Sequence, residues 1–303
     1  MNLRIAITGS TGLIGEAVVA HFLKQGALVT RMIRPTSKIQ SKENYISWDI
    51  NSGLVSKDAL EGYDVVIHLA GANLADSRWT DAYKKVIYDS RVKGTLRISQ
   101  ILSELKNPPK LLLSASAVGY YGAYETHEEI TEASPVGKDF LAKVCYDWER
   151  ATQMAQQKGI RVVNMRFGAV LSSKGGALAK MLPIFQSGMG GKLGNGTQGF
   201  SWIALDEIPL IMDHLINTPT INGPVNVVGF QAVTNEQFTK ILGEVLSKPT
   251  NIPAPAFAIK TMFGEMGEVL LLKGARVVPK KLKTSGYRFR YLTLESSLRK
   301  CLE

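Results

Sequence analysis

The sequence predicts an α/β protein with a Rossmann-type doubly wound parallel sheet, a smaller substrate-side region and a C-terminal appendage. Three observations lead to this fold class. The chain opens on a short apolar run followed directly by the glycine-rich turn TGSTGLIG, from Thr8 to Gly15. Apolar runs and amphipathic stretches then alternate up to about residue 166, as repeated strand–helix units do. Beyond Gly168, glycine-rich loops and a proline-rich segment separate the remaining helices.

The individual elements follow in order from the residue pattern. Continuous apolar runs predict buried parallel strands, and amphipathic stretches between them predict helices. The expected strands are 3–7, 27–33, 45–48, 64–70, 110–114 and 159–166, and the expected helices are 16–25, 79–105, 140–158, 206–217 and 234–246. Thr234 and Gln237 have the spacing of a capping box. We expect one domain over residues 1–250, with substrate-side elements at about 168–250, and a small basic domain over 251–303.

Composition narrows the class of protein. The chain has 303 residues, 45% of them hydrophobic, which is enough for a full core. No apolar run is long enough for a signal-peptide core or a membrane span, so we expect a cytoplasmic protein with no membrane partner. Two cysteines exclude a disulfide framework. The four histidines show no metal-ligand spacing, so no metal is predicted.

The positive charge is concentrated near the C-terminus. The net charge is +10, and residues 271–303 hold nine basic residues against two acidic ones. A solvated basic face is the favoured interpretation, and an anionic partner such as nucleic acid or a lipid surface is the alternative. Tyr287, Phe289 and Tyr291 are the only aromatic residues there. Because that is little for a base-stacking surface, we expect no nucleic-acid partner.

The glycine turn predicts a dinucleotide site. Gly9 allows a tight turn out of the strand, Gly12 lets the backbone approach a pyrophosphate, and Gly15 lets the helix lie close to the sheet. The order of the glycines is G-x-x-G-x-x-G. The strand before this turn and the helix after it are the context that such a site requires.

The end of the second strand predicts which dinucleotide is bound. An acidic residue there would bind the adenosine ribose, but the chain has Arg31 and Arg34 instead, followed by Ser37 and Lys38. Arginine suits a 2′-phosphate, so NADP is the expected cofactor. Asp49 either binds the adenine amino group or caps a turn. The expected cofactor-binding residues are Thr8, Gly9, Thr11, Gly12, Leu13, Ile14, Gly15, Arg31, Arg34, Asp49, Leu69, Ala70, Gly71, Ser114, Lys143 and Arg166.

Several stretches together resemble one protein family. They are TGSTGLIG, HLAGANLADSRW, SASAVGYYG, FLAKVCYDWE, RFGAVLSSKGGAL, GMGGKLGNGTQGFSWIALDE and GARVVPKKL. The chain resembles the extended short-chain dehydrogenases/reductases, and most closely an atypical epimerase-family subgroup with a small C-terminal domain, sometimes labelled cell-division-inhibitor-like. The resemblance implies an NADP(H)-dependent oxidoreductase or epimerase-like enzyme. Its substrate would be small and could be nucleotide-linked, such as a nucleotide sugar, and a homodimer is possible.

The resemblance also suggests catalytic residues. The superfamily uses Ser or Thr at the end of the fifth strand and a Tyr-x-x-x-Lys pair on the next helix. Ser116 matches the first position and Lys143 the lysine, but Asp139 stands four residues before Lys143 in place of tyrosine. Tyr120 and Tyr121 then either donate the proton or pack over the substrate. The missing tyrosine leaves a second function open, that of a non-catalytic NADP-binding regulatory protein, for example one linked to cell division.

Residues farther along the chain have two interpretations each. Arg166 ends the sixth strand and either contacts nicotinamide and substrate or anchors a buried carboxylate. The glycine-rich stretch offers four candidate substrate contacts, Lys192, Gln198, Ser201 and Trp202. Asp139 and Lys143 could also form an ordinary ion pair on a helix surface.

Overall fold

A computed structural model describes residues 3–35, 44–49, 57–123 and 129–303, and it contains a seven-stranded sheet. The strand order is β10-β6-β5-β4-β1-β2-β3, and all neighbouring strands are parallel. The strands are β1 (Arg4–Thr8), β2 (Leu28–Ile33), β3 (Tyr45–Ser47), β4 (Val65–His68), β5 (Leu111–Ala117), β6 (Arg161–Phe167) and β10 (Gly223–Val227). The predicted doubly wound sheet is thus confirmed. Its order reverses between β1 and β4, where ligands bind in such folds.

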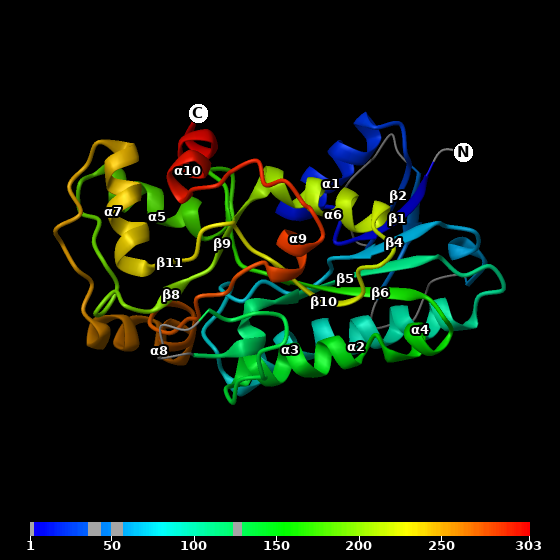
Figure 1. Cartoon of the computed structure of the whole chain (residues 1–303). Helices are drawn as coiled ribbons and strands as arrows, with labels where there is room; N and C mark the ends of the chain where they lie inside the picture. Colours follow the sequence, from blue (N-terminus) through cyan, green and yellow to red (C-terminus); the bar gives the residue numbers. More distant parts are fainter. Residues whose placement is uncertain (1–2, 36–43, 50–56, 124–128) are drawn as a thin grey trace.

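Helices cover both faces of the sheet (Figure 1). One layer contains α1 (Leu13–Lys24) and α6 (Ile208–Asn217); the other contains α2 (Asp81–Glu104), α3 (Phe140–Arg150) and α4 (Gln153–Gln157). Neighbouring strand residues point to opposite layers, as the strand period of two requires. Ile5 and Ile7 join the core beside α1 and α6, whereas Ala6 joins the core beside α2.

A second group of elements lies beyond the carboxyl edge of the sheet (Figure 1). Helix α9 (Lys280–Thr284) packs instead against β10, and its Leu282 joins the core beside α1 and α6. The helices of the second group are α5 (Gly176–Gln186), α7 (Asn235–Leu246), α8 (Ala256–Leu271) and α10 (Leu294–Leu302). Two short pairs complete it, β7 (Ala169–Leu171) with β9 (Trp202–Ala204), and β8 (Gly199–Phe200) with β11 (Val233–Thr234). Short 3₁₀ turns cover Lys57–Leu60, Val118–Tyr121 and Leu205–Glu207. A common apolar cluster joins α5, α7 and α10 around the buried Trp202.

The basic tail packs against the rest of the chain. Ser201 Oγ donates a hydrogen bond to the Ala275 carbonyl at 2.8 Å, and Asn226 Nδ2 donates to the Val278 carbonyl at 3.0 Å. The carboxylate of Glu207 accepts a hydrogen bond from the Tyr287 hydroxyl at 2.5 Å. These buried contacts join the two predicted domains, residues 1–250 and 251–303. The division between them therefore remains a proposal.

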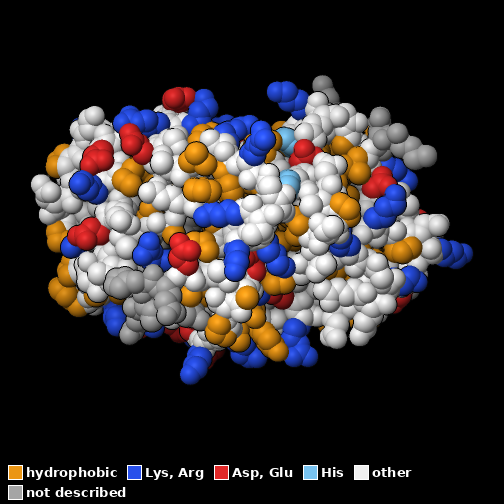
Figure 2. Space-filling view, viewed as in Figure 1, with side chains coloured by type: hydrophobic (Ala, Val, Ile, Leu, Met, Phe, Trp, Pro, Cys, Tyr) orange, Lys and Arg blue, Asp and Glu red, His pale blue; other side chains and the backbone are white. Residues whose placement is uncertain are grey.

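Acidic groups offset much of the tail's charge. Lys273 pairs with Glu268, Arg290 with Asp206, Arg299 with Glu295, and Lys300 with Glu303. Figure 2 shows the molecule from the same side as Figure 1, with Lys and Arg side chains scattered over the surface and Asp and Glu side chains among them. This arrangement is typical of a solvated surface.

Within the main sheet and its helix layers, two elements differ from the sequence-based expectation. The helix expected over 140–158 is divided into α3 and α4, because the Thr152 hydroxyl bonds back to the Glu149 carbonyl and the Ala155 N–H donates to Ser99 Oγ. Strand β10 was not expected, since its apolar run is short and follows glycine and proline. The capping box of Thr234 and Gln237 is confirmed.

In the described part of the chain, no helix is both long and apolar enough to span a bilayer. No group of three or more His, Cys, Asp or Glu residues in this part of the chain is arranged to hold a metal ion.

Candidate cofactor and active site

The turn between β1 and α1 forms a tight backbone cradle. Gly9 has φ of 64°, and a Cβ atom there would lie 2.7 Å from the Leu69 carbonyl carbon. A Cβ on Gly15 would lie 2.2 Å from the Gly9 carbonyl oxygen, whereas a Cβ on Gly12 would lie 3.4 Å from the same oxygen, an ordinary contact. No side chain caps the N-terminus of α1, so its first amide groups are available to an anion. The residues present therefore fit the pyrophosphate of a dinucleotide.

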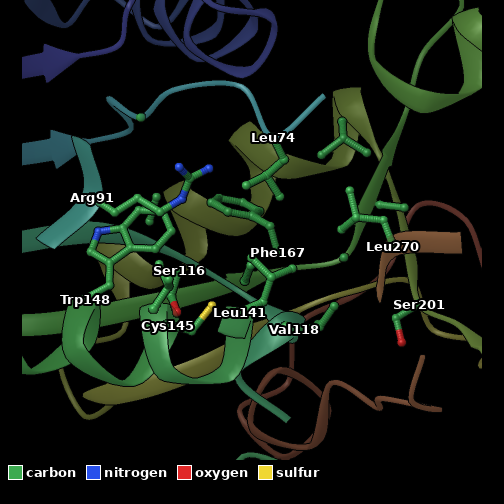
Figure 3. A pocket seen from close by; sticks show the side chains of 18 of the residues that line it. Leu74, Arg91, Ser116, Val118, Leu141, Cys145, Trp148, Phe167, Ser201 and Leu270 are labelled. Atoms are coloured by element: carbon green, nitrogen blue, oxygen red, sulfur yellow. The ribbon is translucent and has the colours of Figure 1, made fainter. Parts of the chain in front are cut away.

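Two cavities extend from this cradle. The first has a volume of about 550 Å³ and the second about 1240 Å³. Both are lined by Gly9, Gly12, Leu69 and Gly71, so they meet at the glycine turn. The first is also lined by Leu13, Ile14 and Gly15, and the second by Thr11, Arg34, Asp49 and Ala70. Most of the expected cofactor-binding residues are thus gathered in one extended crevice, whose first part is seen in Figure 3.

Thr8 and His68 lie opposite each other where β1 and β4 meet. The Thr8 hydroxyl accepts hydrogen bonds from the amides of Leu69 and Ala70, so it donates its own proton to His68 Nδ1, at 2.7 Å. His68 is therefore protonated on Nε2. Burial lowers the pKa of His68 to about 4, which keeps the ring neutral. Thr8 supports the loop that forms the cradle, and its side chain is fully buried.

The two arginines of the second strand have different positions. Arg31 is buried, and its guanidinium donates to both carboxylate oxygens of Glu16, at 3.0 and 3.1 Å, and to the Ser10 carbonyl. Arg34 is exposed and lines the second cavity. Of the two arginines, only Arg34 is among the residues that line the second cavity, and Arg31 supports the glycine turn. Ser37 and Lys38 lie outside the described residues.

Of the expected pair at α3, Asp139 is among the residues that line the first cavity, whereas Lys143 lines neither cavity. The Lys143 side chain is 71% exposed and pairs with Asp147 at 3.0 Å. Asp139 is the N-cap of α3, where its carboxylate accepts from the Ala142 amide at 2.9 Å. The expectation that Lys143 faces the cofactor site is therefore wrong, because the α3 side chains one turn apart that line the cavity are Leu141 and Cys145. Burial raises the pKa of the Cys145 thiol to about 12.

Ser116, Glu149 and Arg166 form one buried network. The Ser116 hydroxyl lines the first cavity but donates its proton to Glu149 Oε1 at 2.8 Å. The Arg166 guanidinium donates two hydrogen bonds to the same carboxylate, at 2.7 and 2.8 Å. Ser116 and Arg166 lie side by side because they are partners in the register of β5 and β6. Of the two interpretations of Arg166, anchoring a buried carboxylate is the one that the structure supports.

The two candidate proton donors lie behind the wall of the cavity. The Tyr121 hydroxyl accepts from Arg166 at 2.8 Å and donates to Asn226 Oδ1 at 2.6 Å. Burial raises the pKa of Tyr121 to about 12. The ring of Tyr120 stacks on the Arg166 guanidinium, with 3.5 Å from its centroid to Cζ. Neither tyrosine is among the residues that line the two cavities.

The remaining predicted site residues are buried or bonded to other parts of the chain. Ser114 is fully buried within β5. Lys192 pairs with Glu236, Gln198 donates to two backbone carbonyls, and the Trp202 indole donates to the Gln231 carbonyl. Ser201 lines the first cavity, but its hydroxyl bonds to the tail.

Sequence analysis missed several cavity residues. Leu141, Val144, Cys145 and Trp148 follow the i, i+3, i+4, i+7 spacing of one helix face, and this spacing places Lys143 on the opposite side. It is the signal that could have identified them. Leu270, Lys273 and Ala275, from the tail, also line the first cavity. No local pattern predicts that these distant residues meet the glycine turn.

Comparisons with known proteins agree with this geometry. Residues 5–228 match the NAD dependent epimerase/dehydratase family, and residues 254–301 match a domain of unknown function, DUF1731. An epimerase family protein of Mycobacterium bovis is 38% identical over 298 residues, which are 98% of this chain and 97% of that protein. The chloroplastic SDR39U1 homolog of Arabidopsis thaliana is 34% identical over 309 residues, which are 100% of this chain and 87% of that protein.

A solved structure resembles the whole chain. The human epimerase family protein SDR39U1, determined with NADPH, has a TM-score of 0.88 and 30% identity, and the match covers 99% of both chains. The fold, the glycine cradle and the sequence of this chain all match those of epimerase-family proteins. The chain belongs to the NAD dependent epimerase/dehydratase family.

Proposed function

We propose that this protein is a regulatory protein that binds NADP(H) and does not carry out the tyrosine-dependent proton transfer of the wider superfamily. One observation carries the proposal: α3 presents Leu141 and Cys145 to the cavity, where a phenol and an ammonium would be needed. A leucine has no proton to give. A buried thiol whose pKa is raised to about 12 carries no charge at neutral pH.

The choice of NADP over NAD rests on Arg34. Its guanidinium lines the cavity at the end of β2, where an acidic residue would otherwise bind a ribose hydroxyl. A guanidinium can form a two-pronged contact with a phosphate. The human relative solved with NADPH supports the same choice.

A second candidate is an NADP(H)-dependent oxidoreductase or epimerase-like enzyme that acts on a small substrate, such as a nucleotide sugar. The observation in its favour is Ser116, which stands at the end of β5 on the cavity wall. To donate to a substrate oxygen, its hydroxyl would have to leave Glu149. A positioned general acid is worth about 10² to 10⁴ in rate, so turnover would be slow.

Two measurements separate these candidates. Calorimetry with NADPH and NADH tests cofactor binding, and NADPH consumption across a panel of sugar nucleotides and small carbonyls tests turnover. We expect tight NADPH binding without turnover. Turnover that is lost in Ser116→Ala but kept in Tyr120→Phe would establish the enzyme instead. The cytoplasmic location and the homodimer remain predictions.

A further inference from the structure

Arg91 of α2 lies on the wall of the first cavity, and no carboxylate among the described residues pairs with it. Its side chain is partly buried and lies beside Trp148, with 5.2 Å from Cζ to the ring centroid (Figure 3). Its one hydrogen bond within the described residues runs from Nη1 to the Ile87 carbonyl, at 3.3 Å. That distance is long for such a bond. Most of its donors are therefore available to a ligand.

Three other arginines in the described part of the chain have full sets of partners. Arg31 pairs with Glu16 and Arg166 with Glu149. Arg161 donates to four backbone carbonyls. Burial without an opposite charge lowers the pKa of Arg91 below its usual value, so the cation is held in an unfavourable environment. An anion bound there would offset this cost.

The position of Arg91 indicates which anion this is. A Cβ on Gly71 would lie 3.7 Å from Cζ of Arg91, so the guanidinium is close to the Gly71 backbone. Gly71 lines both cavities, together with Gly9 and Gly12 of the cradle. The guanidinium therefore lies where the two cavities meet. In a dinucleotide that spans both cavities, the group at this junction is the pyrophosphate.

We propose that Arg91 binds the cofactor pyrophosphate and supplies, from α2, the positive charge that α3 does not present to the cavity. The inference rests on the proposed binding of NADP(H). The glycine-turn amides would contact the pyrophosphate from α1, and the planar guanidinium would form charge-assisted bonds from the opposite helix layer.

A series of cofactor fragments tests this contact by calorimetry. NADPH and 2′-phospho-ADP-ribose contain the pyrophosphate, whereas adenosine 2′-monophosphate contains only the adenine-side phosphate. We expect Arg91→Gln to weaken binding of the first two by about 10- to 100-fold and of the third by less than twofold. Arg97→Gln, which removes the same charge from α2 away from both cavities, should leave all three affinities unchanged.

The outcomes are distinguishable. If wild-type protein binds no NADPH, the proposed function fails. If wild type binds NADPH and Arg91→Gln binds it equally well, only the role of Arg91 fails. Equal losses for all three ligands would place Arg91 at the adenine end and overturn the inference. Should Arg91→Gln melt at a lower temperature, Arg91→Lys carries the test, since it keeps the charge and loses the two-pronged geometry; a loss confined to the two pyrophosphate ligands is expected.

Discussion

Glu149 and Arg166 form a two-pronged ion pair, with Nε and Nη2 at 2.7 and 2.8 Å from the two carboxylate oxygens. The pair is nearly buried, with side-chain exposures of 12% and 3%. Glu149→Gln should therefore lower the free energy of unfolding by about 3 to 5 kcal/mol, because Arg166 keeps its charge without a partner. Urea unfolding measures this. Glu149→Gln/Arg166→Met should regain part of the loss, and a loss below about 1 kcal/mol in the single variant would contradict the prediction.

Arg34 should determine cofactor preference. Arg34→Ala should weaken NADPH binding by about 1.5 to 3 kcal/mol, since it removes a charged hydrogen-bonding partner, and should leave NADH binding nearly unchanged. Calorimetry with both cofactors checks this. Arg31→Met is the control: it should lower stability through the loss of the Glu16 contact while the preference for NADPH is kept. An unchanged preference in Arg34→Ala would show that another group binds the 2′-phosphate.

Asp139 should act as a helix cap only. Asp139→Ala should lower the free energy of unfolding by about 1 kcal/mol, because the Ala142 amide loses its acceptor, and Asp139→Asn should keep most of that stability. NADPH affinity should be the same in both variants. Asp139→Tyr should lose the cap and gain no activity. A rise in NADPH consumption in Asp139→Tyr would return this position to the catalytic candidates.

His68 should make stability depend on pH. Its pKa is about 4 in the folded protein and near 6.5 in the unfolded chain, so the unfolded chain binds more protons between these values. The stabilisation is complete above pH 6.5 and is lost as the pH falls, by about 2 kcal/mol between pH 7 and 5. Urea unfolding at both pH values measures it. His68→Asn should lose this dependence, while His21→Asn, at a partly buried site, should keep most of it.

The C-terminal segment should be required for stability. Ending the chain before Pro255 removes Leu282, Leu294 and Leu298 from the core and leaves Glu207 without the Tyr287 hydroxyl. The shortened protein should melt at a clearly lower temperature or be insoluble. Duplex DNA at physiological salt should bind the full chain only weakly and without sequence preference. A shortened protein with an unchanged melting temperature would contradict this prediction.

The sheet and the cofactor cradle could be predicted because both depend on local patterns. The apolar runs identified six of the seven strands of the main sheet, and the glycine turn placed the crevice. The cavity-facing residues of α3 could be predicted less reliably. Lys143 was matched to the superfamily's lysine by residue type and not by its position on the face of the helix. Lys143 is one position from Val144 and two from Cys145, yet it points to solvent. The partners of Arg31 and Arg166 depend on tertiary packing, which no spacing in the sequence reveals.

The first cavity takes its walls from both ends of the chain, from Gly9 near the start and from Leu270 to Ala275 near the end. During synthesis the glycine turn leaves the ribosome long before the wall that faces it. The nascent chain can pair its first strands well before it can enclose this cavity. Closure of the first cavity is thus a late folding event, which requires that Leu270 to Ala275 have been made and packed near the glycine turn.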